Sequence, residues 1–182
     1  MRNPSSVNRS CITAGMLRSA QHDNVNPVKV GRTLFINRPH GTKVHYGALL
    51  KFAEQFGRMR GSNIYAASPH PQHLDNLAHR LRQVGFSTAQ MCQCRVHSNQ
   101  RYKSDVDTRI TIDLVCAANT QQIDTVILAS GDSDFLPLVE YLHCQHIRVI
   151  VIGPDEATAS EMKVKSDAFF HTSEIAGLHM TV

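Results

Sequence analysis

The sequence DTVILASGDSDFLPLV, residues 124–139, places a short apolar run directly before a turn that carries two aspartates. Residues 125–129 form a continuous apolar run, which is typical of a fully buried central strand. The following SGDSD predicts a turn, and residues 135–143 predict a helix with Pro137 in its first turn. Asp132 and Asp134 are therefore expected at the carboxyl end of a buried strand.

The same alternation of apolar runs and helical stretches extends on both sides of this segment. Further strands are predicted at residues 28–37, 62–67, 86–97 and 147–152, further helices at 44–56, 71–84 and 107–118, and a basic polar loop at 98–104. Gly57 and Gly85 are expected to end two of the helices, and Asp107 to cap the third. This rhythm predicts an α/β domain with a doubly wound, mostly parallel sheet of about five or six strands and helices on both faces.

Four polar side chains follow from this fold as candidates for one site. In a doubly wound sheet, ligands bind beyond the carboxyl ends of the strands. Asn37 ends the first predicted strand, Asp132 and Asp134 follow the strand at 125–129, and Asp107 begins the preceding helix. Carboxylates that face one opening repel each other unless a cation neutralises them, and oxygen ligands suit Mg²⁺ or Mn²⁺. The alternative is that Asp107 and Asp132 only cap helices.

Two segments together carry a family resemblance, KSDVDTRITIDLV at residues 103–115 and the opening segment at 124–139. They resemble the NYN domain, a PIN-like ribonuclease family, in its SGDxDFxPL motif at 130–138 and its DxxxxxD element from Asp107 to Asp113. The likeness is strong over residues 103–152 and rests on the order of elements before them. SDAF at 166–169 resembles the family's closing segment.

The resemblance implies a PIN-like domain over residues 28–182 that hydrolyses RNA phosphodiester bonds with a bound divalent metal ion. The catalytic acids that it implies are Asp107, Asp113, Asp132 and Asp134. The metal ion, Mg²⁺ or Mn²⁺, would be held by Asp132, Asp134, Asp107 and Asn37.

The first predicted strand departs from the family pattern. The family usually ends this strand with FIDGxN, whereas this chain reads FINRPHG at residues 35–41, so Asn37 stands where an aspartate is expected and Arg38 replaces a glycine. An amide oxygen can bind Mg²⁺, but it brings no charge. We expect metal binding to be weaker by about 10- to 100-fold or more. The alternative function is therefore an inactive or weakened NYN domain that regulates by binding RNA or a protein.

Asp113 and Ser130 each leave two interpretations open. Six residues separate Asp107 from Asp113, which places them about 240° apart around a helix. Asp113 would either line the site more deeply or pair as a buried acid with Lys103 or a backbone amide. Ser130 would hydrogen-bond a carboxylate or an RNA phosphate, or would serve only as a turn residue.

Charge is strongly segregated along the chain. Residues 38–103 hold ten Lys and Arg against two acids, a balance of +8, whereas residues 104–182 hold four against twelve, a balance of −8. The basic half predicts a polyanionic partner, and single-stranded RNA fits the resemblance. The candidate RNA-binding residues are Arg38, Lys43, Arg101, Lys103 and Ser130. Ordinary solvated surface charge is the alternative explanation.

Length and composition limit the remaining choices. The 182 residues suit one domain plus an arm, and residues 1–27 are expected to form a disordered arm, with a transit peptide or a mis-assigned start as alternatives. Five cysteines without framework spacing favour the cytoplasm, and no apolar run is long enough to cross a membrane. A homodimer is an open expectation. A phosphatase or a flap-type DNA nuclease would use a similar acidic site.

Overall fold

The structure, a computed structural model, describes residues 32–37, 44–68, 71–93, 95–96, 102–103, 105–120 and 123–178. The expected arm at residues 1–27 lies outside this range, and for residues 32–37, 95–96 and 102–103 the description covers the backbone. The elements are, in chain order, β1 (Arg32–Asn37), α2 (Tyr46–Glu54), β2 (Met59–Ser68), α3 (Pro71–Val84), β3 (Thr88–Gln93), β4 (Arg95–Val96), β5 (Tyr102–Lys103), α4 (Val106–Thr120), β6 (Thr125–Ala129), η1 (Ser133–Phe135), α5 (Leu136–Cys144), β7 (Arg148–Gly153), η2 (Asp155–Ala157), α6 (Ser160–Lys165), β8 (Ala168–His171) and η3 (Thr172–Glu174).

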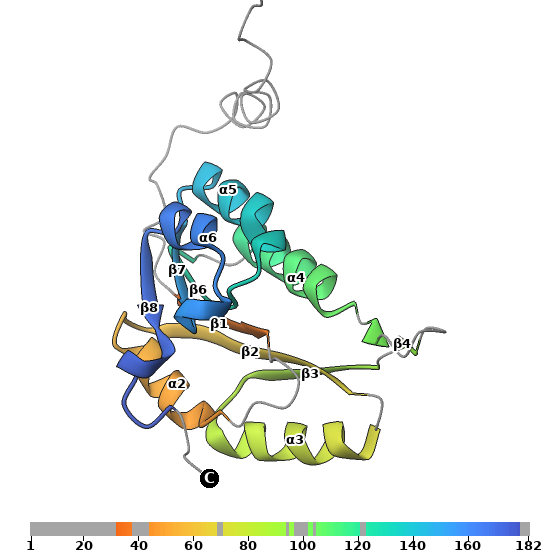
Figure 1. The fold of residues 1–182 in the computed structure, drawn as a ribbon. Helices are drawn as coiled ribbons and strands as arrows, with labels where there is room; N and C mark the ends of the chain where they lie inside the picture. The colour runs from red at the N-terminus through yellow and green to blue at the C-terminus, as the bar shows by residue number, and fades with distance from the viewer. Residues whose placement is uncertain are drawn as a thin grey trace, which may run out of the picture.

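A parallel sheet forms the centre of the molecule (Figure 1). Its six strands follow the order β3-β2-β1-β6-β7-β8, and every neighbouring pair runs parallel. β4 and β5 form a separate two-stranded antiparallel sheet. The α/β class with a parallel sheet and flanking helices is thus confirmed.

Helices cover both faces of the sheet, and each face has its own apolar core. Figure 1 shows α4, α5 and α6 on one face and α2 and α3 on the other. Successive residues of a strand point to opposite faces, so Val126 and Leu128 join the first core while Ile127 joins the second. This explains why β6 is apolar along its whole length, as the sequence predicted.

The strongest sequence patterns give the observed bounds. α3 begins at Pro71 and ends at Val84, and β6 spans the five residues 125–129, both as predicted. Gly57 and Gly85 follow α2 and α3 with φ of 127° and 107°, a left-handed region that favours glycine. Gly85 ends α3 where the sequence analysis expected it to, whereas α2 already ends at Glu54, three residues before Gly57.

The structure differs from the sequence-based expectations in several details. The single strand predicted at 86–97 is divided into β3 and β4, and the predicted loop at 98–104 contains β5, whose Lys103 is the Cα partner of Arg95. β8 was not predicted as a strand. Asp107 does not cap α4, because the helix already begins at Val106 and Asp107 lies within its first turn. These differences depend on strand pairing and local backbone geometry, which the spacing of apolar residues along one segment does not predict.

β8 is fixed at its start by Asp167. Asp167 Oδ2 accepts hydrogen bonds from the Val149 amide at 2.7 Å and pairs with His143 Nε2 at 3.0 Å. Burial would raise the pKa of Asp167, but the Val149 hydrogen bond and the His143 contact outweigh it, so the pKa lies below its usual value. Folding therefore stabilises the ionised form of the Asp167 side chain relative to the unfolded chain.

This lowered pKa predicts a pH-dependent contribution to stability. The contribution is complete above the unfolded pKa of an aspartate, about 3.9, and disappears as pH falls through the lower folded pKa. Asp167→Asn should lower the free energy of unfolding by about 1 kcal/mol at pH 7. This is less than is usual for a hydrogen bond to a charged group, because the Asp167 side chain is partly exposed to solvent. Urea unfolding should show the difference between the two proteins shrinking at acidic pH, and a constant difference would contradict this explanation.

No helix in the described part of the chain is long and apolar enough to cross a membrane.

Candidate active site

The carboxyl ends of β1 and β6 lie side by side at the centre of the sheet. From β1 the chain winds outward to β2 and β3, and from β6 it winds the other way to β7 and β8. The connections diverge at this point, which is where a doubly wound sheet opens to bind a ligand. Ile36 of β1 is the Cα partner of Ala129 of β6. Asn37 and Ser130, the next residues of the two strands, therefore follow at the same edge.

The loop after β6 presents two aspartates to solvent. Asp132 has an extended backbone and caps η1, because its Oδ1 accepts a hydrogen bond from the Asp134 amide at 3.0 Å. Ser130 is 9 % exposed, and its Oγ accepts a hydrogen bond from the Asp132 amide at 3.4 Å. Phe135, 1 % exposed, anchors the end of η1 in the core. The Ser130 hydrogen bond and the buried Phe135 side chain therefore fix the two ends of the loop, while the carboxylates of Asp132 and Asp134 remain exposed.

Gly131 lets this loop pack closely against the chain that follows β7. Its carbonyl oxygen accepts a hydrogen bond from the Ala159 amide at 3.0 Å. A Cβ atom at Gly131 would lie 2.6 Å from Thr158 Cα and 2.7 Å from the Ala157 carbonyl oxygen. Thr158 is itself held by a 2.7 Å hydrogen bond from its Oγ1 to the Pro154 carbonyl. The position of the two aspartates therefore depends on a glycine at 131.

Asp107 reaches the same edge of the sheet from α4. This helix leads into the amino end of β6, so its first turn lies near the carboxyl ends of the strands, and α4 contacts η1. Asp107 is half-buried, and its carbonyl oxygen accepts a hydrogen bond from Thr111 Oγ1 at 2.8 Å. α4 thus brings a third acid toward the loop with Asp132 and Asp134.

Asp113 lies further along α4 and contacts the sheet. Its Oδ2 accepts hydrogen bonds from Tyr65 Oη at 2.6 Å and from Gln90 Nε2 at 2.8 Å. Tyr65 is the Cα partner of Gln90 on one side and of Asn37 on the other. Asp113 therefore ties α4 to β2 and β3 at the level where β1 ends.

Sequence reasoning missed Tyr65 and Gln90. Each lies in a predicted strand, but their common contact with Asp113 depends on the register between β2 and β3, which single-strand patterns do not contain. A tyrosine inside an otherwise small and apolar strand was the available signal, because a buried phenol usually finds a hydrogen-bond partner.

The candidate ligands suit a divalent cation by their chemistry more than by their present spacing. Asp107, Asp132 and Asp134 offer oxygen atoms, which Mg²⁺ and Mn²⁺ prefer. Within the described residues, however, no group of three His, Cys, Asp or Glu lies close enough to hold a metal ion. For Asn37 the structure describes only the backbone, and Asn37 is a candidate ligand because it ends β1 at the same edge of the sheet.

The candidate RNA-binding residues are mostly outside the described range. The structure does not describe Arg38, Lys43 or Arg101. For Lys103 it describes the backbone, which belongs to β5. β5 precedes α4, so Lys103 lies four residues before Asp107 in the chain. Ser130 is described in full, and its hydroxyl supports the loop backbone.

Comparison with known proteins now identifies the family, because the NYN domain matches residues 35–174. The chain belongs to the NYN domain family. The resemblance drawn from the two motifs is thereby confirmed, and membership indicates a PIN-like nuclease fold. NYN domains generally bind RNA and typically depend on a divalent metal ion.

Two known proteins are similar to this chain. It is 27 % identical over 117 residues to "Low amplitude and bright protein LabA" of Synechococcus elongatus, a match that covers 61 % of each chain. The chain thus spans less than two thirds of that curated relative. A crystal structure of a protein of unknown function from Vibrio parahaemolyticus has a TM-score of 0.65 at 24 % identity, covering 81 % of this chain and 96 % of that one. This second likeness concerns the fold.

Proposed function

We propose that this NYN domain is a metal-dependent ribonuclease that hydrolyses phosphodiester bonds of single-stranded RNA in the cytoplasm. The observation that carries the proposal is the meeting of the β1 and β6 carboxyl ends, with Asp132 and Asp134 exposed beside Asn37 and with α4 against η1. A doubly wound sheet binds its ligand at such a point. Exposed acids there, in a family of RNA-binding proteins, favour phosphodiester chemistry over a purely structural role.

Each candidate residue has a separate role in this proposal. Asp132, Asp134, Asp107 and Asn37 would hold Mg²⁺ or Mn²⁺, which supplies an activated water and charge stabilisation for the leaving oxygen. Ser130 keeps the loop of Asp132 and Asp134 in place. Asp113, proposed from sequence as a fourth catalytic acid, orients α4 through Tyr65 and Gln90. Arg38, Lys43, Arg101 and Lys103 would bind RNA phosphates along the border of the site.

Metal binding tests the acidic part of the site. Calorimetric titration of the purified chain with Mn²⁺ should show binding, and Asp132→Asn or Asp134→Asn should weaken it by about tenfold or more, because each removes a charged ligand. Asp124→Asn is a matched control, since Asp124 precedes the same strand at its opposite end. Equal Mn²⁺ affinity in all four proteins would remove these aspartates from the metal site.

The second candidate function is a non-catalytic NYN domain that regulates by binding RNA or a protein. The observation that favours it is Asn37, an uncharged residue at the end of β1 where the family motif has an aspartate. The two candidates differ in one measurable property. The regulator binds RNA and leaves it intact under conditions in which the nuclease cuts it.

A further inference from the structure

A buried hydrogen bond joins α4 to the sheet near the candidate active site. Tyr65 is 1 % exposed, and its Oη donates to Asp113 Oδ2 at 2.6 Å. Gln90 Nε2 donates a second bond of 2.8 Å to the same oxygen atom. The buried phenol and the half-buried carboxylate both lose solvation on folding, so each needs the other as a partner. We call Tyr65, Gln90 and Asp113 the α4 clamp.

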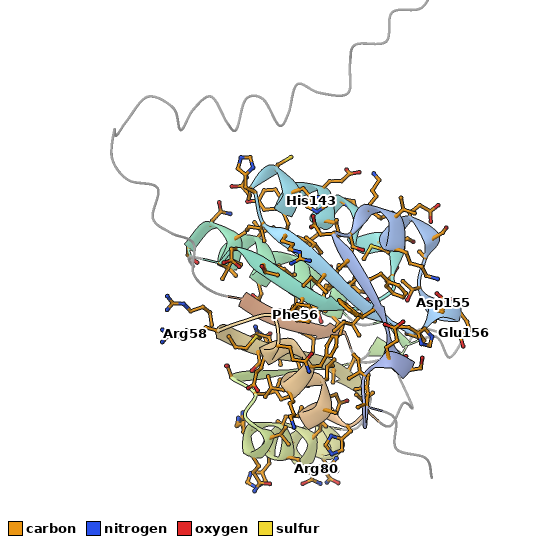
Figure 2. All side chains as sticks on the ribbon, turned by 90° about the vertical axis from the view of Figure 1, so that its left-hand side faces the viewer. Phe56, Arg58, Arg80, His143, Asp155 and Glu156 are labelled. Carbon is orange, nitrogen blue, oxygen red and sulfur yellow. The ribbon has the colours of Figure 1, made fainter. Side chains whose placement is uncertain are left out.

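Apolar packing alone would define the position of α4 less strictly. Ile110 and Leu114 are fully buried and belong to the same core as the Tyr65 ring. Figure 2 shows this layer, with His143 of α5, on one face of the sheet and α3, with Arg80, on the other. The hydrophobic effect has no preferred direction, so apolar contacts permit small shifts of a helix along its axis. The hydrogen bonds of the α4 clamp require a defined geometry and resist such shifts.

The position of α4 matters because the helix carries Asp107. Asp107 precedes Asp113 by six residues, which is about 9 Å along a helix axis. α4 contacts η1, the short helix that contains Asp134 and that Asp132 caps. A shift of α4 would therefore move Asp107 relative to the other two acids. A displacement of about 1 Å in an active site can lower a rate by about 100-fold.

The α4 clamp uses a single oxygen atom of Asp113. Both hydrogen bonds reach Oδ2. An amide oxygen has two lone pairs and can accept the same two bonds. The clamp therefore needs an oxygen acceptor at residue 113, whereas a metal ligand also contributes through its charge. This difference separates a positioning role of Asp113 from direct metal binding.

A second phenol holds the opposite end of α4. Asn119 Nδ2 donates a 2.7 Å hydrogen bond to Tyr141 Oη of α5. Asn119 follows Asp107 by twelve residues, about 18 Å along the helix axis. Tyr141 thus makes a contact of the same kind with the same helix, far from the acids.

We propose that Tyr65 is a positioning residue of the candidate metal site and acts on Asp107 through Asp113 and α4. The Tyr65 hydroxyl holds Asp113, and Asp113 holds α4 where its first turn reaches the acids after β6. Gln90 supports the same oxygen atom of Asp113. This role rests on the proposed metal-dependent function, because it concerns the affinity of that site for the metal ion.

Tyr65→Phe removes the hydroxyl and keeps the ring, so it tests the clamp with little change in packing. Calorimetric titration of the full chain should give an Mn²⁺ dissociation constant about tenfold higher than that of the wild type, as expected when a group that orients a ligand is lost. Tyr141→Phe makes the same chemical change at the far end of α4 and should leave the Mn²⁺ affinity unchanged. Circular dichroism and urea unfolding establish that both variants are folded.

Two substitutions of Asp113 separate position from charge. Asp113→Asn keeps an oxygen atom for both donors, whereas Asp113→Leu leaves both donors without this acceptor. We expect Asp113→Asn to retain most of the Mn²⁺ affinity and to bind about tenfold more tightly than Asp113→Leu. Equally weak binding by the two variants would show that the charge of Asp113 is required, and would overturn the positioning role.

Failure of this role and failure of the proposed function give different results. A wild type that binds no Mn²⁺ overturns both. A wild type that binds Mn²⁺ no more tightly than folded Tyr65→Phe overturns the positioning role alone. If Tyr65→Phe does not fold, Gln90→Met replaces it, because it removes the second donor and keeps the length of the side chain. Gln90→Met should then bind Mn²⁺ more weakly than Tyr141→Phe, and equal affinities would overturn the positioning role.

Discussion

The Asn37→Asp variant is expected to bind Mn²⁺ about 10- to 100-fold more tightly than the wild type and to cut RNA at least about tenfold faster. Asn37 ends β1 next to Ser130, at the edge where Asp132 and Asp134 are exposed. Aspartate is nearly the same size as asparagine and adds a full negative charge at this edge. A tenfold gain in rate corresponds to about 1.4 kcal/mol of barrier, a modest effect for one charged ligand.

Calorimetry and cleavage of labelled single-stranded RNA measure the two effects of this substitution. Asn76→Asp is a control with the same change of charge, because Asn76 is exposed on α3 and outside the site. An inactive wild type with an active Asn37→Asp variant would identify a silenced nuclease. If the wild type already cuts RNA and the variant cuts no faster, Asn37 does not limit the reaction, and our interpretation of the first strand is wrong.

Gly131→Ala is expected to lower the free energy of unfolding by about 3 kcal/mol, which is large for the addition of one methyl group. The new Cβ would lie 2.6 Å from Thr158 Cα, closer than real Cβ atoms approach a backbone carbon. Thr158 cannot yield easily, because it is 6 % exposed and hydrogen-bonded to Pro154. The loop that carries Asp132 must therefore move, so we also expect weaker Mn²⁺ binding.

Urea unfolding compares Gly131→Ala with Gly47→Ala, a control within α2. At Gly47 the nearest atom to a new Cβ is His45 Cε1 at 3.3 Å, a side-chain atom that can shift. Alanine also favours a helix over glycine, so Gly47→Ala should be neutral or slightly stabilising. A Gly131→Ala protein as stable as the wild type would mean that the loop is not held by Thr158.

The sequence predicted a helix or strand best when all the residues that determine it lie within that one segment. β6 is apolar throughout because both of its faces are covered, and α3 carries its own proline start and glycine stop. β8 was missed because it is four residues long and packs at an edge, which leaves too few positions for a pattern. The same limitation explains β4 and β5, since each is two residues long and exists through pairing with the other.

The same distinction holds for the candidate site: residues that one segment places were predicted, and contacts between segments were not. The rule that acids after parallel strands gather at one edge placed Asp132 and Asp134 beside the end of β1 from sequence alone. The partners of Asp113 could not be predicted, because Tyr65 and Gln90 meet it through the register of two strands and the position of a helix. The exchange of Asp for Asn at residue 37 was visible only against the family motif.

One assay tests the central claim, that the acids at the carboxyl ends of β1 and β6 cut RNA. Labelled single-stranded RNA is incubated with the wild type and with Asp132→Asn, each in Mn²⁺ and in excess chelator, after circular dichroism has shown that both proteins are folded. We predict cleavage by the wild type in Mn²⁺ only, and none by Asp132→Asn above the level with chelator. Equal cleavage by the two proteins, or an intact RNA in every reaction including one with Asn37→Asp, would contradict the account.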